Sequence, residues 1–251
     1  QLKGWSSKVF VLLLLGFAAT DFVITMTLSA ADAAQHAIEN PYFHPYLGDA
    51  RVLLTVSLLA LLAVVFLKGF QEAIGLAAAV AVPYLLLNLV VLGRGVLEIA
   101  RHPELLANWR NGLFSHGDWT AILLASAIIF PRLALGMSGF ETGVAVMPLI
   151  DGRESEEHGG LPTHRIRATR KLLATAALIM SVMLVLSSFV TSLLISETSY
   201  RIGGPASGRA VAYLGHEFLG ATFGTVYDIS TIIILWFAGA SAMAGLLNLV
   251  P

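Results

Sequence analysis

Residues 9–34 read VFVLLLLGFAATDFVITMTLSAADAA, and this stretch decides the class of fold. It exceeds the about 20 mostly apolar residues that a helix needs to cross a lipid bilayer. Its ionisable side chains are Asp21 and Asp32. A charge inside a spanning helix costs roughly 2.5–3.5 kcal/mol to insert, so each such residue is by default a functional hypothesis. The stretch therefore predicts a membrane span that carries a polar site.

The rest of the chain has the composition of a membrane protein. Apolar residues make up 57% of its 251 residues and charged residues 12%, against about 45–50% and about 25% in soluble domains. The net charge of -1 gives no indication of a nucleic-acid partner. Since the chain has no cysteine, disulfides, thiolate metal sites and cysteine nucleophiles are excluded. We expect the lipid bilayer to be the main partner.

The hydropathy pattern predicts an all-α polytopic membrane protein with one transmembrane domain over residues 1–251. Six apolar segments are expected to be helices, at about 9–34, 52–67, 73–92, 119–150, 172–195 and 227–250. The fourth is too long for one straight span, and the amphipathic segment 208–220 is expected to form a short helix on one face. Polar links are expected at 35–51, 93–118, 151–171 and 197–225. The seven histidines fall in such links and show no metal-ligand spacing.

A basic cluster, RIRATRK at 165–171, sets the expected orientation. Lysine and arginine close to a helix end favour the cytoplasmic side, so this link is predicted to be cytoplasmic. We expect a multi-pass protein of the cytoplasmic membrane. Because the chain begins at Gln1 and its last helix stops at Pro251, we expect it to be a fragment of a longer protein.

The first candidate site lies on the helix at 9–34. Thr25, Ser29 and Asp32 follow Asp21 at i+4, i+8 and i+11, which places them in one narrow stripe at about 100° per residue. Carboxylate and hydroxyl oxygens are the ligands that a small, hard cation requires when it sheds water. The alternative is structural: the hydroxyls bond to carbonyls four residues earlier, and Asp21 pairs with a basic neighbour.

The second candidate site is GMSGFETG at 136–143, within the overlong helix. Glu141 lies there among three glycines, Gly136, Gly139 and Gly143, with Ser138 close by. Each glycine weakens a helix by about 1 kcal/mol, and a discontinuous helix in a membrane holds substrate in many secondary transporters. The alternative is close helix packing through small residues. The same packing is expected for AGASAMAG at 238–245, where Ser241 is a weaker candidate for an ion ligand.

No motif indicates an enzyme. The sequence contains no nucleophile elbow, phosphate loop or Walker motif, which argues against catalysis and against direct use of ATP. No cofactor is expected. The expected ligands are a small-molecule or ion substrate and a coupling ion, H⁺, Na⁺ or K⁺, with a monovalent cation as the one metal considered, held by Asp21, Thr25, Ser29 and Glu141.

Four motifs resemble the amino acid–polyamine–organocation permease superfamily, over essentially the whole chain. TDFVITMTLS at 20–29 resembles its third helix, and FLKGFQEAIG at 66–75 the link between its fourth and fifth helices. LALGMSGFETG at 133–143 and RIRATRKLL at 165–173 resemble its broken sixth helix and the following cytoplasmic loop; residues 231–251 resemble its eighth helix. The resemblance implies a partial LeuT-like, five-plus-five inverted-repeat transporter fold whose first two helices precede this fragment.

Two branches of the superfamily are similar to these motifs. Many members with similar motifs resemble amino acid permeases. The potassium-importing branch has an Asp-Tyr-x-x-Thr-x-x-x-Ser pattern, which Asp21, Thr25 and Ser29 match while Phe22 replaces the tyrosine. Its sixth helix has Thr-Gly-Val-Glu, which resembles SGFE at 138–141.

The expected function is cation- or proton-coupled uptake of amino acids by a secondary active transporter. Potassium import is the alternative within the superfamily, and a non-transporting sensor or receptor is the alternative of another class. The predicted mechanism has Asp21 and Glu141 facing one cavity, where each carboxylate disfavours ionisation of the other until a cation or a proton binds.

Overall fold

The computed structural model describes residues 5–48, 50–67, 73–114, 118–133 and 163–249, and this part of the chain is helical without any strand. The all-α prediction is confirmed. The helices are α1 (Trp5–Ile38), α2 (His44–Leu47), α3 (Arg51–Leu67), α4 (Ala73–Arg101), α5 (Glu104–Phe114), α6 (Trp119–Leu133), α9 (Thr163–Leu194), α10 (Glu197–Tyr200) and α11 (Ala210–Leu249).

Four of the described helices are long and apolar enough to cross a membrane: Lys8–Ile38, Ala79–Arg101, Ile166–Leu194 and Ala210–Leu247. Large apolar side chains cover their outer faces; Leu12 and Phe17 are 67% and 68% exposed. Contiguous apolar surface of this kind needs lipid around it. The chain is therefore a multi-pass membrane protein. The segment predicted at 52–67 is a helix but has only 17 residues. The axes of α5 and α6 are bent by 86°, as in a broken span or a re-entrant loop.

Several predicted boundaries were wrong because polar residues were taken to end helices. α1 continues through Gln35 to Ile38, and α4 continues past 92 to Arg101. In α4 the Arg94 side chain donates to Glu98 at 2.6 Å, an i,i+4 pair that supports helix in a polar stretch. The predicted links at 93–118 and 35–51 also hold α5 and α2, and α9 begins at Thr163.

α11 has two arms that meet at Gly220. The backbone φ at Gly220 is 85°, a value that glycine adopts without steric cost. This value lies outside the α-helical region, so the helix is interrupted there. The arm at 210–219 confirms that the predicted amphipathic segment is helical. The second arm, 221–249, begins six residues before the predicted start at 227, because the sequence pattern did not separate the kink from a loop.

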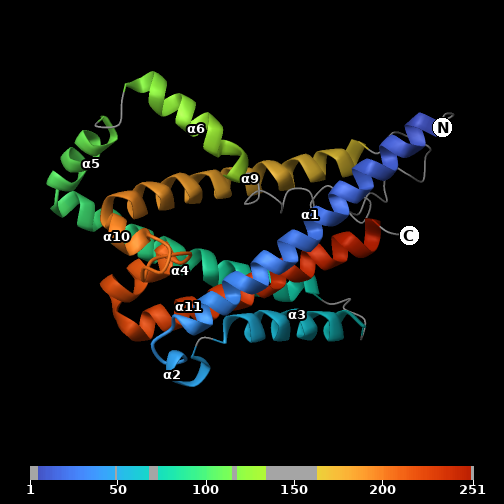
Figure 1. The fold of residues 1–251 in the computed structure, drawn as a ribbon, viewed down its shortest axis with the longest axis horizontal. Helices are drawn as coiled ribbons and strands as arrows, with labels where there is room; N and C mark the ends of the chain where they lie inside the picture. Colours follow the sequence, from blue (N-terminus) through green and yellow to red (C-terminus); the bar gives the residue numbers. More distant parts are fainter. Residues whose placement is uncertain (1–4, 49, 68–72, 115–117, 134–162, 250–251) are drawn as a thin grey trace.

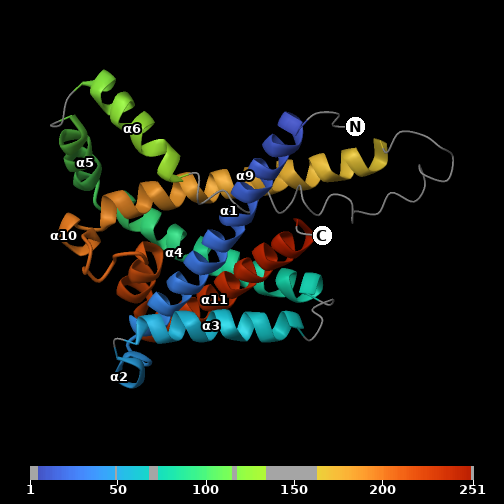
Figure 2. The same cartoon turned by 45° about the vertical axis from the view of Figure 1, so that its right-hand side comes forward.

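The core is the antiparallel pair of α1 and α11, and other helices pack against this pair (Figure 1). α1 and α11 lie side by side along the molecule in both views (Figure 2). One buried cluster joins α1, α3 and the second arm of α11 through Phe22, Met26, Leu62, Ala240 and Ala242. A second cluster joins α4 and α9 to both arms of α11. α11 is thus the element shared by both clusters.

Small residues allow this close packing, as predicted for 238–245. A Cβ atom added to Gly245 would lie 2.6 Å from the Phe22 ring of α1. Ala240 and Ala242 are almost fully buried, whereas Ser241 is exposed and donates to the Ala238 carbonyl of its own helix. The packing interpretation is therefore favoured over an ion-ligand role for Ser241.

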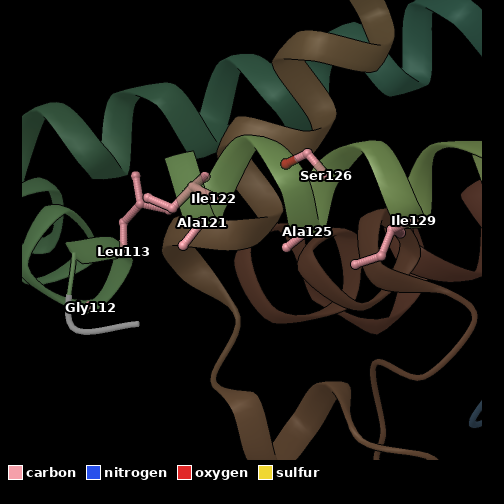
Figure 3. Close-up of a pocket in the computed structure, with 7 residues that line it drawn as sticks. All are labelled: Gly112, Leu113, Ala121, Ile122, Ala125, Ser126 and Ile129. Atoms are coloured by element: carbon pink, nitrogen blue, oxygen red, sulfur yellow. The ribbon is translucent and has the colours of Figure 1, made fainter. Parts of the chain in front are cut away.

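α5 and α6 stand apart from the α1 and α11 pair in both views. The angle between them forms an open hollow (Figure 3). It is lined by Gly112, Leu113, Ala121, Ile122, Ala125, Ser126 and Ile129. Among the described residues that line it, none has a charged side chain, and Ser126 alone has a polar one.

Candidate functional site

Asp21 lies in the interior of the candidate span Lys8–Ile38, on the turn of α1 that packs against α11. The side chain is half-buried. Its Oδ2 atom is fully buried and has no hydrogen-bond partner among the described residues. The basic neighbour of the structural alternative is thus not found in the part of the chain that the structure describes. An unpaired carboxylate at this position can accept a cation or a proton.

The hydroxyls of the predicted stripe are not bonded to carbonyls of their own helix in the described part of the chain. Thr25 and Ser29 are half-buried, and within the described ranges neither hydroxyl makes a hydrogen bond. The threonines that do bond back to i−4 carbonyls are Thr20 and Thr27, on other faces of α1. Asp32, the last member of the stripe, is exposed.

The second predicted site lies outside the described residues. This holds for Gly136, Ser138, Gly139, Glu141 and Gly143, and so also for the predicted break in the helix and for the pairing of Glu141 with Asp21. Those statements stay predictions.

A second carboxylate, which the sequence analysis did not select, is completely buried on α11. Asp228 has no exposed surface and accepts three hydrogen bonds. His36 Nδ1 of α1 donates to Oδ1 at 2.8 Å. His216 Nε2 and Asn40 Nδ2 donate to Oδ2 at 2.8 and 2.7 Å. We call these four residues the Asp228 cluster.

The Asp228 cluster joins three segments of the chain. His36 and Asn40 come from the end of α1 and the residues after it, and His216 comes from the arm of α11 before the kink. Asp228 itself lies on the arm after Gly220. A single carboxylate therefore holds both arms of α11 and the end of α1 together.

The bonding pattern determines which ring nitrogens carry a hydrogen. An ionised carboxylate only accepts, so the nitrogens that face Asp228 are N–H donors: Nδ1 of His36 and Nε2 of His216. In neutral imidazoles the other nitrogen of each ring is then a bare acceptor. For His216 this atom, Nδ1, is buried without a partner among the described residues.

Neighbouring groups fix the geometry of the cluster. Asn40 Nδ2 also donates to the Thr225 hydroxyl at 3.2 Å, and its Oδ1 accepts from the Tyr42 backbone N–H at 3.0 Å. The His216 ring lies directly on Gly224, where an added Cβ would collide with it. Gly224 therefore gives the ring the space it needs to reach Asp228.

One buried cation lies near the cluster. Arg209, just before α11, is 7% exposed and within electrostatic range of Asp228. Its Nε and Nη1 atoms are buried without partners in the described part of the chain. The positive charge of Arg209 balances the negative charge of Asp228 while both imidazoles are neutral.

The prediction that the histidines lie in links was wrong for His36, His44, His164 and His216, which are in helices. Two signals could have found the cluster. His36 follows Asp21 at i+15, so it falls in the same stripe of α1 at about 100° per residue. Asp228 is the one acidic residue between 221 and 249, but the predicted start at 227 placed it at a helix end, where a charge is ordinary.

The cluster and the stripe differ in what they can bind. Among the described residues no group of three histidine or acidic side chains has an arrangement that could hold a metal ion. The Asp228 cluster is a hydrogen-bonded network with titratable donors, and the Asp21 stripe is a set of oxygens with unused bonding capacity.

Comparison with known proteins identifies no relative. No protein-family model matches the chain, and neither a curated protein nor a solved structure matches it significantly. The resemblance to the permease superfamily accordingly stands on the sequence motifs alone.

Proposed function

We propose that the chain is the membrane domain of a secondary active transporter that couples substrate uptake to a cation or a proton. One observation carries the proposal: the buried Oδ2 of Asp21 has no partner among the described residues, in the interior of a helix long enough to span a membrane. An unpaired carboxylate in such a helix is costly, and a bound cation or proton removes that cost. Thr25 and Ser29 add neutral oxygens that replace lost hydration.

The sequence resemblance supplies the proposed substrate and architecture. It favours amino acid uptake across the cytoplasmic membrane, on a five-plus-five inverted-repeat fold with α1 as its third helix and residues 119–150 as its broken sixth. Glu141 is then the proposed second carboxylate of the ion site. Potassium import is the second candidate, because Asp21, Thr25 and Ser29 match the pattern of that branch. A sensor with the same fold is the candidate of another class.

Uptake by the full-length protein in proteoliposomes tests the proposal. Radiolabelled amino acids, and radioactive rubidium as a potassium tracer, are offered under imposed proton, sodium and potassium gradients. Asp21→Asn is expected to abolish accumulation of whichever substrate the native protein takes up, while the protein still folds. Glu141→Gln is expected to do the same.

Asp118→Asn is the matched control. This carboxylate is exposed before α6, and hydrogen bonds from the Thr120 hydroxyl and the Ala121 N–H hold its pKa below its usual range. It is therefore ionised and already has partners, so the control should transport at the native rate. Accumulation of no substrate under any gradient would favour the sensor. Native uptake by Asp21→Asn would reject the ion site.

A further inference from the structure

The Asp228 cluster combines complete burial with donors that can change their charge. Histidine is the side chain whose ordinary charge change falls between pH 5 and 8. We propose that Asp228 and His36 form a proton-binding site, and that the bound proton strengthens the contact between α1 and α11. The proposal stands on the cluster and does not require that the protein transports.

His36 can bind the proton without any change in its hydrogen bond to Asp228. His36 already donates from Nδ1 to Asp228 Oδ1 at 2.8 Å, so a second proton enters at the opposite nitrogen, Nε2. The existing bond is kept and becomes an ion pair between an imidazolium and a carboxylate. Such charge-assisted bonds are roughly twice as strong as neutral ones. Because His36 belongs to α1 and Asp228 to α11, the added strength acts between the two helices.

The surroundings of the His216 ring offer no acceptor for a second proton among the described residues. Its Nδ1 is buried with no partner among the described residues, so a proton bound there would create a buried N–H without an acceptor. His36 has no such buried, unpartnered nitrogen. His216 and Asn40 therefore hold the carboxylate in place, and His36 takes the proton.

The other charged groups around the pair act more weakly. Arg209 is within electrostatic range of Asp228, but no hydrogen bond joins these two residues in the described part of the chain. His36 Nδ1 lies 2.8 Å from the Asp228 carboxylate, and Coulomb attraction is strongest at such short distances. Asp32 of α1 is in range of His36 and favours the proton. The Tyr227 hydroxyl donates to Asn88 of α4 and stays neutral.

Hydrogen exchange of the full-length protein in lipid nanodiscs tests the site. Mass spectrometry gives protection factors, corrected for the intrinsic rate at each pH, for peptides covering 30–40 and 221–231. Going from pH 8 to pH 5.5, protection of both segments should rise about fivefold, from the added strength of one charge-assisted hydrogen bond. His36→Asn, whose amide nitrogen takes the place of Nδ1 and still donates but does not titrate, should show no rise.

Two variants serve as matched controls. His216→Gln keeps a donor at the position of Nε2 and should retain the pH response. His44→Asn removes the other titratable ring near the end of α1, whose Nδ1 contacts the Ile38 carbonyl at 3.0 Å, and should also retain it. Equal protection of the native protein at both pH values would overturn the proposal. So would a native response in His36→Asn, or loss of the response in either control. Loss of uptake in every variant leaves the proton-binding site unaffected, so the two proposals are separable.

Discussion

Asp21 and Asp228 lie on the same packed pair of helices in opposite environments. Asp228 is fully buried, and its two oxygens accept three hydrogen bonds from other segments. Asp21 is half-buried and has one buried oxygen with no partner among the described residues. A carboxylate in a membrane helix thus stabilises the fold where the protein supplies its hydrogen-bond donors. Where the protein leaves it unpaired, it is available to a ligand.

The largest expected effect comes from removing the satisfied carboxylate. Asp228→Ala removes three hydrogen bonds and leaves the N–H groups of His36 and His216 without an acceptor, at about 1 kcal/mol or more each. We expect the free energy of unfolding to fall by about 3 kcal/mol. Thermal unfolding of the purified protein in one detergent at fixed pH measures it. A loss no greater than that of an exposed-site variant would show that the cluster does not hold the helices together.

The second effect comes from a steric clash within the Asp228 cluster, with the carboxylate itself left in place. In Gly224→Ala the new methyl group collides with the His216 ring, whose bond to Asp228 restrains it. The strain of about 1–3 kcal/mol exceeds the about 1 kcal/mol gained from better helix propensity, so a net loss of about 1 kcal/mol is expected.

Gly215→Ala is the control for that change. There the added Cβ would lie 3.5 Å from Val91 Cγ2, an ordinary contact, so the helix gain should remain and the variant should be more stable than the native protein. Opposite signs for the two glycine variants in the same unfolding assay support the close contact at Gly224. Equal signs contradict it.

The third effect concerns Asp21, where the substitution is expected to stabilise the protein instead of destabilising it. Asp21→Asn removes a partly buried charge that has no partner in the described residues. We therefore expect the free energy of unfolding to rise by about 0.5–1 kcal/mol. The same assay measures it beside uptake. Lower stability would mean that Asp21 has a structural partner, and the comparison with Asp228 would fail.

The smallest effect concerns Ser241. Its hydroxyl is exposed and bonds to its own helix, so Ser241→Ala should change stability by less than about 0.5 kcal/mol and leave uptake unchanged. Reduced uptake with native stability would restore Ser241 as an ion ligand.

Helix type was predictable from the sequence, and helix ends were not. Apolar runs of spanning length identify α1, α4, α9 and α11 because lipid leaves few other solutions for a backbone. Ends depend on local pairs such as Arg94 with Glu98, which make a polar stretch helical and cannot be told from a link by hydropathy. The helical character of 210–219 was predicted, and its continuity with the next helix through Gly220 was not.

One candidate site, the Asp21 stripe, was predictable from the sequence, and the other, the Asp228 cluster, was not. The sequence alone determined that Asp21, Thr25 and Ser29 share one stripe, because their positions follow from the period of a single helix. It also determined the membrane class, since composition and run length require lipid. The meeting of His36, Asn40, His216 and Asp228 follows from the three-dimensional packing and not from the sequence pattern. The packing of α1 on α11 and the kink at Gly220 bring together residues separated by up to 192 positions. The helical period predicts which face of a helix a residue occupies. Which residues of other helices it contacts depends on how the helices pack.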